Sequence, residues 1–197
     1  MFYPNSRLKP QAIPQNPKKS RCKMAIPLYD LTVASYLQTI GAIENVLTKG
    51  LAFAQEKGKD PADLVAARLY EDMLPLSFQI ASVAHHSLNA INGVKAGLFA
   101  PPGKTPPHTY ADLQEILATT RKGLEAFTPE EVNALENADV VFEVRDLKLP
   151  FTGQGFLLSF SLPNFYFHAA TAYDILRANG VPLGKRDFLG QMRMKGM

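Results

Sequence analysis

Tryptophan is absent from this 197-residue chain, and Cys22 is its only cysteine. One cysteine can form neither a disulfide within the chain nor a cluster of thiolate metal ligands, which fits a reducing compartment. No apolar run reaches the roughly 20 residues that a membrane-spanning helix needs, and the N-terminal segment lacks the apolar centre of a secretory signal. The sequence therefore predicts a cytoplasmic protein with no membrane partner.

Acidic residues are missing from residues 1–23, which contain six of the 21 Lys and Arg residues and four prolines. This composition is typical of a disordered basic extension. The rest of the chain keeps 15 basic residues against all 18 acidic ones. No nucleic-acid partner is expected, because such proteins carry their basic residues on the folded surface. We expect residues 24–197 to form a single domain.

Several motifs of known enzyme classes are also missing. The chain has no Walker-type phosphate loop, no GxGxxG, no HExxH and no serine flanked by the glycines of a nucleophile elbow. It also lacks the Glu-x-x-His motif of di-iron helical bundles. These absences leave no support for a nucleotide, zinc-protease or di-iron site.

Apolar residues recur at intervals of three and four along most of the chain, which predicts an all-α fold. The expected helices span residues 27–56, 61–73, 76–94, 110–127, 129–137 and 156–179. Residues 139–149 (DVVFEVRDLKL) instead indicate a short extended segment. Residues 97–108, rich in proline and glycine, predict a loop that could border an opening. No helical pattern follows Gly180, although Phe188 and Leu189 could dock on the helices.

The last long helix, residues 156–179, holds the densest aromatic cluster and is expected to bend at Pro163. On a helical wheel, His168 lies near the centre of its apolar face together with Asn164 and Thr171. A buried polar group without a partner costs about 1–3 kcal/mol. His168 is therefore either a core histidine with a satisfied hydrogen bond or part of a site.

Polar residues of two other expected helices also fall near the core. Tyr36 lies on the apolar stripe of the first helix, as does Glu44, whose carboxylate either reaches the rim of the core or points into a site. In the third helix, Ser87 lies on the apolar face and His86 on its flank. Adjacent side chains on a regular helix diverge by roughly 100°, so His85 is expected to be solvated.

Residues 163–168 (PNFYFH), 171–173 (TAY) and 175–190 (ILRANGVPLGKRDFLG) resemble the "domain of unknown function 1993" branch of the DinB/YfiT-like superfamily. Residues 28–33 (LYDLTV) and 72–76 (DMLPL) are also similar to it. The resemblance covers about residues 24–190. It implies a DinB-like four-helix bundle with long loops between the helices, and a homodimer.

In metal-binding members of this superfamily, one histidine comes from the second helix and two come from an HxxxH pair on the last helix. Here His168 is followed four residues later by Ala172, so this triad is incomplete. Zinc needs three protein ligands even at a catalytic site, and the only other conceivable set is His86, His168 and Glu44. We therefore expect no metal and no other cofactor.

Two functions remain open. In the first, the bundle binds a small molecule between its helices, and His168 performs metal-free acid/base chemistry in an isomerisation, dehydration or cyclisation. In the second, the protein is a non-catalytic structural or dimeric interaction protein, in which His168 and Asn164 satisfy each other. The first assigns catalysis to His168 and Glu44 and ligand contacts to Asn164, Thr171, Ser87, Tyr36 and His86.

Overall fold

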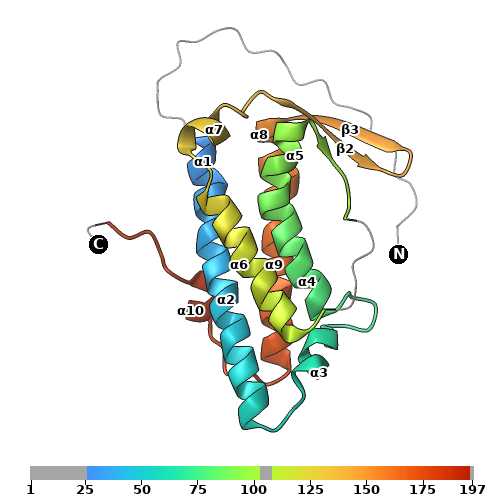
Figure 1. The fold of residues 1–197 in the computed structure, drawn as a ribbon, viewed down its shortest axis with the longest axis vertical. Coiled ribbons are helices and arrows are strands. Elements are labelled where there is room, and N and C mark those ends of the chain that lie inside the picture. The colour runs from blue at the N-terminus through green and yellow to red at the C-terminus, as the bar shows by residue number, and fades with distance from the viewer. Residues whose placement is uncertain (1–25, 103–107, 196–197) are drawn as a thin grey trace.

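The long helical segments of the protein lie side by side (Figure 1). The computed structural model describes residues 26–102 and 108–195. Helix α2 packs against α6 and α9, and α4 packs against the same two helices. Every long segment therefore buries an apolar face between two neighbours. The segments are α2 (Val33–Glu56), α4 (Leu76–Ala84) with η1 (His85–Asn89) and α5 (Ala90–Ala96), α6 (Tyr110–Glu125) and α9 (Leu162–Ala178).

Short capping motifs explain where several helices begin. At the start of α6, Thr109 Oγ1 accepts a bond from the backbone N–H of Asp112, and Asp112 Oδ2 accepts one from the backbone N–H of Thr109. Thr128 and Glu131 repeat this capping box at α7 (Pro129–Asn133). These reciprocal bonds satisfy amides that have no partner within the helix. The starts expected at residues 110 and 129 are therefore confirmed.

Other helix boundaries differ from the expected ones. The first helix is divided at Thr32 into α1 (Leu28–Leu31) and α2. Helix α3 (Pro61–Ala66) ends seven residues before the expected position, and α7 ends four residues early. A short helix, α10 (Lys185–Leu189), lies where none was expected, and its Phe188 packs edge-on against Tyr173 at 5.9 Å.

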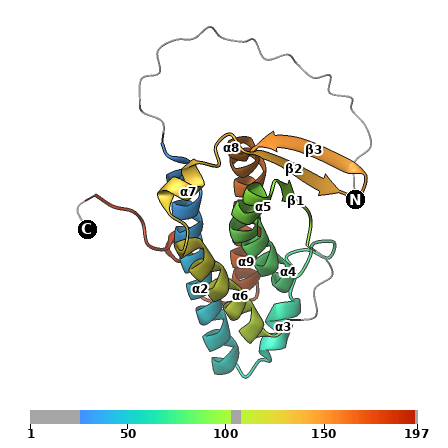
Figure 2. The same cartoon turned by 45° about the horizontal axis from the view of Figure 1, so that its top comes forward.

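A small sheet lies at one end of the helices, near α5 and α8 (Figure 2). Its strands follow the order β1 (Leu98–Phe99), β2 (Asp139–Val144) and β3 (Leu147–Thr152), with β1 parallel and β3 antiparallel to β2. The extended segment expected at 139–149 is confirmed and continues to Thr152. The fold is mostly helical rather than all-α, because Leu98 and Phe99 pair with Val141 and Phe142 and complete a small three-stranded sheet.

The last long segment contains three helical parts: α8 (Gly153–Phe156), η2 (Leu157–Ser161) and α9. The π-helical η2 ends just before Pro163, where a bend was expected. All five residues expected on its main apolar face are buried: Leu157, Phe165, Ala172, Ile175 and Leu176. The expected extension at residues 1–23 lies outside the described residues. Among those described, no helix is both long and apolar enough to span a bilayer.

Gly153 joins β3 to α8 in a place with no room for a side chain. A Cβ there would overlap the carbonyl oxygen of Leu135 and lie 2.8 Å from Cγ1 of Val94. We expect Gly153→Ala to lower the free energy of unfolding by about 1–3 kcal/mol, measured by chemical denaturation. Gly184→Ala is the matched control, since the nearest atom to a Cβ there is 3.9 Å away. Equal stability of the two variants would contradict this prediction.

Candidate functional site

A chain of hydrogen bonds joins three helical segments beside the histidines. Ser161 Oγ, at the end of η2, donates to the backbone carbonyl of His86 in η1 at 2.7 Å. Tyr36 Oη of α2 lies 2.8 Å from the same Ser161 Oγ. Because a serine hydroxyl has only one hydrogen, the tyrosine must be the donor in the second bond. The two π-helical segments are thus held together through Ser161, and such segments are frequent at functional sites.

Three histidines gather next to this chain. The rings of His86 and His168 are nearly parallel, with centroids 5.6 Å apart, and the ring of His85 lies 5.2 Å from that of His86. Phe99 of β1 and Phe160 of η2 pack against them. We call His85, His86 and His168 the histidine cluster. It brings the second and last long segments together in aromatic surroundings.

The expectation that His85 is solvated is wrong, because its exposed fraction is 8%. The helix becomes π-helical at this residue, so the angular spacing of a regular helix no longer applies. Phe99 then covers the ring, with the two centroids 4.4 Å apart. Within the described part of the chain, no hydrogen bond of ordinary geometry reaches either ring nitrogen of His85 or Nδ1 of His86.

Gln79 fixes the tautomer of His168. The amide Nε2 of Gln79 donates to the Leu74 carbonyl at 2.8 Å, so its Oε1 faces His168 as an acceptor. His168 Nδ1 lies 2.8 Å from that oxygen and must therefore carry the hydrogen. In the neutral ring the lone pair then belongs to Nε2, to which no described residue donates. Gln79 is almost fully buried, whereas His168 is half-buried and reaches the surface.

Burial lowers the pKa of His168 to about 4 and that of His86 to about 3. The neighbouring imidazoles act in the same direction, because a positive charge on one ring disfavours a second. Burial also lowers the pKa of His85, although the Ala100 backbone opposes that shift. Near neutral pH the rings are uncharged, so they can accept hydrogen bonds but carry no proton to donate as imidazolium acids.

Glu44 lies apart from the histidine cluster and has a different partner. Its Oε2 accepts from Arg121 Nε at 2.9 Å and lies 2.6 Å from Arg121 Nη2, across the contact between α2 and α6. Catalysis was assigned to Glu44 together with His168, but the side chain that bonds to His168 Nδ1 is Gln79. A stripe position on a helical wheel gives the direction of a side chain but not its partner on another helix.

Three other residues that were expected to contact a ligand instead donate hydrogen bonds to the backbone of their own helix. Asn164 Nδ2 donates to the Phe160 carbonyl and Thr171 Oγ1 to the Phe167 carbonyl, both at 2.7 Å. Ser87 Oγ donates to the Val83 carbonyl at 2.6 Å. Such local bonds satisfy buried hydroxyls without a ligand. Asn164 therefore does not form the hydrogen-bonded pair with His168 that the non-catalytic interpretation required. Of the expected site residues, the structure brings together Tyr36, His86 and His168.

Sequence reasoning did not assign Gln79, Ser161 or Phe99 to the candidate site, although Gln79 shares the flank of its helix with His86. A spacing of seven residues separates Gln79 from His86 and also Ser161 from His168. Seven residues are close to two helical turns, so each pair lies on one face. That spacing was the available signal for Gln79 and Ser161. Phe99 reaches the cluster through the sheet, and no local pattern shows this.

The fold and the comparisons with known proteins agree. A crystal structure of a DinB family member protein from Shewanella denitrificans is similar, with a TM-score of 0.72 and 29% identity over 86% of this chain and 96% of that chain. The protein is therefore a mostly helical, DinB-like protein. It belongs to the family described as "Domain of unknown function (DUF1993)", whose sequence profile matches residues 28–189. Comparison with curated proteins gives no match.

The metal-ligand set that the resemblance implied is incomplete in this chain. Ala172, at the third ligand position, is a fully buried methyl group in the core. Across residues 26–102 and 108–195, no group of three or more His, Cys, Asp and Glu is placed to hold a metal ion. His86 and His168 alone supply fewer ligands than zinc needs.

The Tyr36–Ser161–His86 chain should be measurable by a double-mutant cycle. Tyr36→Phe removes one bond and is expected to lower the free energy of unfolding by about 1 kcal/mol. Ser161→Ala leaves both the tyrosine hydroxyl and the His86 carbonyl unpaired and should cost about 2–3 kcal/mol. The double variant should lose less than the sum, as measured by urea denaturation. Strict additivity would show that the bond between Tyr36 and Ser161 contributes nothing.

The lowered pKa of His168 predicts acid sensitivity. An unfolded histidine has a pKa of about 6.5, so between this pH and about 4 the unfolded chain binds more protons than the folded one. The free energy of unfolding should therefore fall as the pH falls through this window. The slope from one histidine is at most about 1.4 kcal/mol per pH unit, and solvent around the half-buried ring reduces it.

His168→Asn should make this pH dependence shallower, because asparagine can keep the bond to Gln79 but does not titrate. Urea denaturation at pH 7, 6 and 5 measures the difference. His108→Asn, at a histidine outside the cluster, controls for the removal of any imidazole. If the wild-type protein and His168→Asn lost stability in parallel, burial would not lower the pKa of His168 in solution.

Proposed function

We propose that the protein binds a small molecule at the surface contact between α4 and α9, with His168 Nε2 as the hydrogen-bond acceptor. The observation that carries this proposal is the tautomer set by Gln79, which directs the hydrogen to Nδ1 and leaves Nε2 with a lone pair. A neutral, half-buried acceptor favours a neutral ligand that donates a hydroxyl or amide hydrogen.

The surroundings of His168 favour a ligand with an aromatic or apolar body. Phe78 of α4 lies edge-on to the imidazole at 5.8 Å, and Phe167 of α9 does so at 5.3 Å. Their exposed fractions are 38% and 56%, so both rings have faces available to a bound molecule. Aromatic surface next to one oriented polar group is the usual composition of a small-molecule site.

We propose fewer catalytic roles for His168 than the sequence suggested. An imidazole with a pKa near 4 is a weak base and is almost never protonated at neutral pH, so His168 would act as a base and not as an acid. Isomerisation, dehydration or cyclisation would then begin with removal of an acidic proton by Nε2. Glu44 has no part in this scheme, because it binds Arg121.

The aromatic residues also support a second candidate, a dimer face. Tyr166 is 38% exposed and lies beside the more exposed Phe167 on α9. Aromatic side chains are enriched at the interfaces between protein chains. In this alternative the protein is a non-catalytic interaction protein, and a second copy covers the surface that a ligand would otherwise use.

Both candidates share a wider proposal about the chain. We infer a cytoplasmic protein in which residues 24–197 form one domain, built on a four-helix bundle of the DinB type. The pairwise packing of α2, α4, α6 and α9 supports the bundle. The similarity of the Shewanella denitrificans protein over most of both chains supports the single domain.

Phenol and anisole test the acceptor directly, because they share an aromatic body and only phenol donates a hydrogen bond. In protein labelled with 15N-histidine, phenol should shift the His168 Nε2 signal saturably, and anisole should not. His168→Asn, which lacks the ε nitrogen, should bind phenol about five- to tenfold more weakly, the value of one hydrogen bond. His108→Asn should bind phenol like the wild type.

Equal effects of phenol and anisole would overturn the acceptor role. If neither compound bound and the protein sedimented as a dimer that Phe167→Ser dissociates, the interaction protein would be the better description. The same spectra report the tautomer of His168, since protonated and unprotonated ring nitrogens resonate far apart. A hydrogen on Nε2 would remove the observation that carries the proposal.

A further inference from the structure

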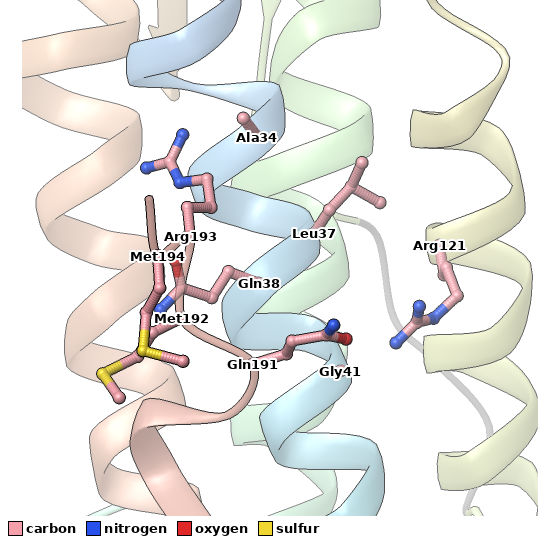
Figure 3. Close-up of a pocket in the computed structure, with 9 residues that line it drawn as sticks. All are labelled: Ala34, Leu37, Gln38, Gly41, Arg121, Gln191, Met192, Arg193 and Met194. Atoms are coloured by element: carbon pink, nitrogen blue, oxygen red, sulfur yellow. The ribbon is translucent and has the colours of Figure 1, made fainter. Parts of the chain in front are cut away.

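A cavity of about 540 Å³ lies between α2, α6 and the C-terminal segment that follows α10 (Figure 3). None of its lining residues belongs to the histidine cluster. The chain enters this region at Gly190, whose φ of 58° lies in the left-handed region. A Cβ at Gly190 would lie 3.0 Å from Cβ of Ala42, so the segment crosses α2 in close contact. We call this space the tail cavity.

One wall of the tail cavity presents an oriented guanidinium. Arg121 lies over Gly41, where an added Cβ would come within 2.5 Å of its Nη2. Glu44 holds the group through Nε and Nη2. A guanidinium has five N–H donors, and Glu125, 3.8 Å from Nη1, is too distant for a hydrogen bond. The Nη1 donors therefore remain available to an acceptor in the cavity.

The opposite wall contributes a second positive charge. Arg193 donates long bonds to the Asp30 carbonyl and to Ser35 Oγ, at 3.3 and 3.4 Å, and both acceptors are neutral. Within the part of the chain that the structure describes, no carboxylate lies within 4.0 Å of Arg193. Figure 3 shows Gln191 and Arg121 extending toward Gly41 from opposite sides. The tail cavity therefore combines one uncompensated cation with directed N–H donors.

The remaining lining is apolar. Ala34 and Leu37 of α2 face Met192 and Met194 of the C-terminal segment, and both methionines are about half exposed. Methionine is flexible and polarisable, so it adapts to ligands of different shape. Glu44 and Glu125 beside Arg121 would repel a doubly charged phosphate more than a carboxylate with a single charge.

We propose that the tail cavity binds a small amphipathic organic anion whose carboxylate accepts from the Nη1 donors of Arg121, with Arg193 on the opposite wall as a second positive charge and the hydrocarbon part against Leu37 and Met192. Guanidinium groups match the two oxygens of a carboxylate in geometry as well as charge. Glu44 and Gly41 are positioning residues, since the first orients Arg121 and the second leaves room for it. This site is separate from the one proposed at His168.

Three probes with the same eight-carbon body test the headgroup: octanoate, 1-octanol and octyl phosphate. In protein with 13C-labelled methionine methyl groups, octanoate should shift the Met192 and Met194 signals saturably. Octanol should bind roughly tenfold more weakly, because it lacks the charge. Octyl phosphate should bind no tighter than octanoate. Equal binding of octanol and octanoate, tighter binding of octyl phosphate, or no saturable shift with octanoate would overturn the proposal.

Arg193→Gln tests the charge without disturbing the fold, because Arg193 contacts only neutral groups through long bonds. We expect this variant to bind octanoate about three- to fivefold more weakly, because the lost charge acts across the cavity, with an unchanged midpoint of thermal unfolding. Arg186→Gln removes the same charge from the exposed face of α10 and should bind like the wild type. Octanoate binding equal to the wild type in Arg193→Gln would overturn the role of this residue.

Gly41→Ala provides a second variant, since the added methyl group displaces Arg121 and should weaken octanoate binding while octanol is unaffected. Octanoate binding unchanged by this substitution would overturn the role of Arg121. His168→Asn should bind octanoate like the wild type, so failure at one site does not imply failure at the other.

Discussion

The burial of uncharged imidazole rings between α4, η1 and α9 is the constraint on which the rest of the site depends. A buried ring is much more stable neutral than charged, which explains why the pKa values of His86 and His168 fall. In a neutral imidazole, one ring nitrogen donates a hydrogen bond and the other accepts one. A buried glutamine with a fixed amide can then decide which nitrogen of His168 carries the hydrogen. The burial of His168 keeps its ring neutral, and the bond to Gln79 then determines which nitrogen accepts a hydrogen bond.

Helix α2 lies between the uncharged hydrogen-bond network around the histidines and the charged side chains at Arg121. Tyr36, on the inner side of this helix, joins the uncharged network through Ser161. Glu44 and Gly41 of the same helix face Arg121 and the C-terminal segment. Glu44 pairs with the Arg121 guanidinium and is not among the groups that shift the pKa values of the histidines. The uncharged groups therefore lie on one side of α2, where His168 has its low pKa, and the charged groups lie on the other, where Glu44 forms its ion pair.

Sequence patterns correctly predicted the features that depend only on residues close together in the chain. Capping boxes at Thr109 and Thr128 and the apolar face of α9 need only neighbouring residues, so the sequence contained them in full. The π-helical turns, the pairing of β1 with β2 and the partner of Glu44 depend on residues 40 or more positions away. A helical wheel assumes regular spacing and therefore failed at His85, where the spacing changes. Tertiary partners, rather than helix positions, were the missing information.

Ala172 shows why the chemistry of the superfamily cannot be transferred to this chain by fold alone. A methyl group there packs in the core of α9 and supplies no lone pair. The two remaining imidazoles lie nearly parallel at 5.6 Å; Nδ1 of His168 bonds to Gln79, whereas no described group bonds to Nδ1 of His86. In this chain Gln79 orients the ring of His168, and the lone pair on Nε2 is the group that the proposed ligand would meet with a hydrogen-bond donor.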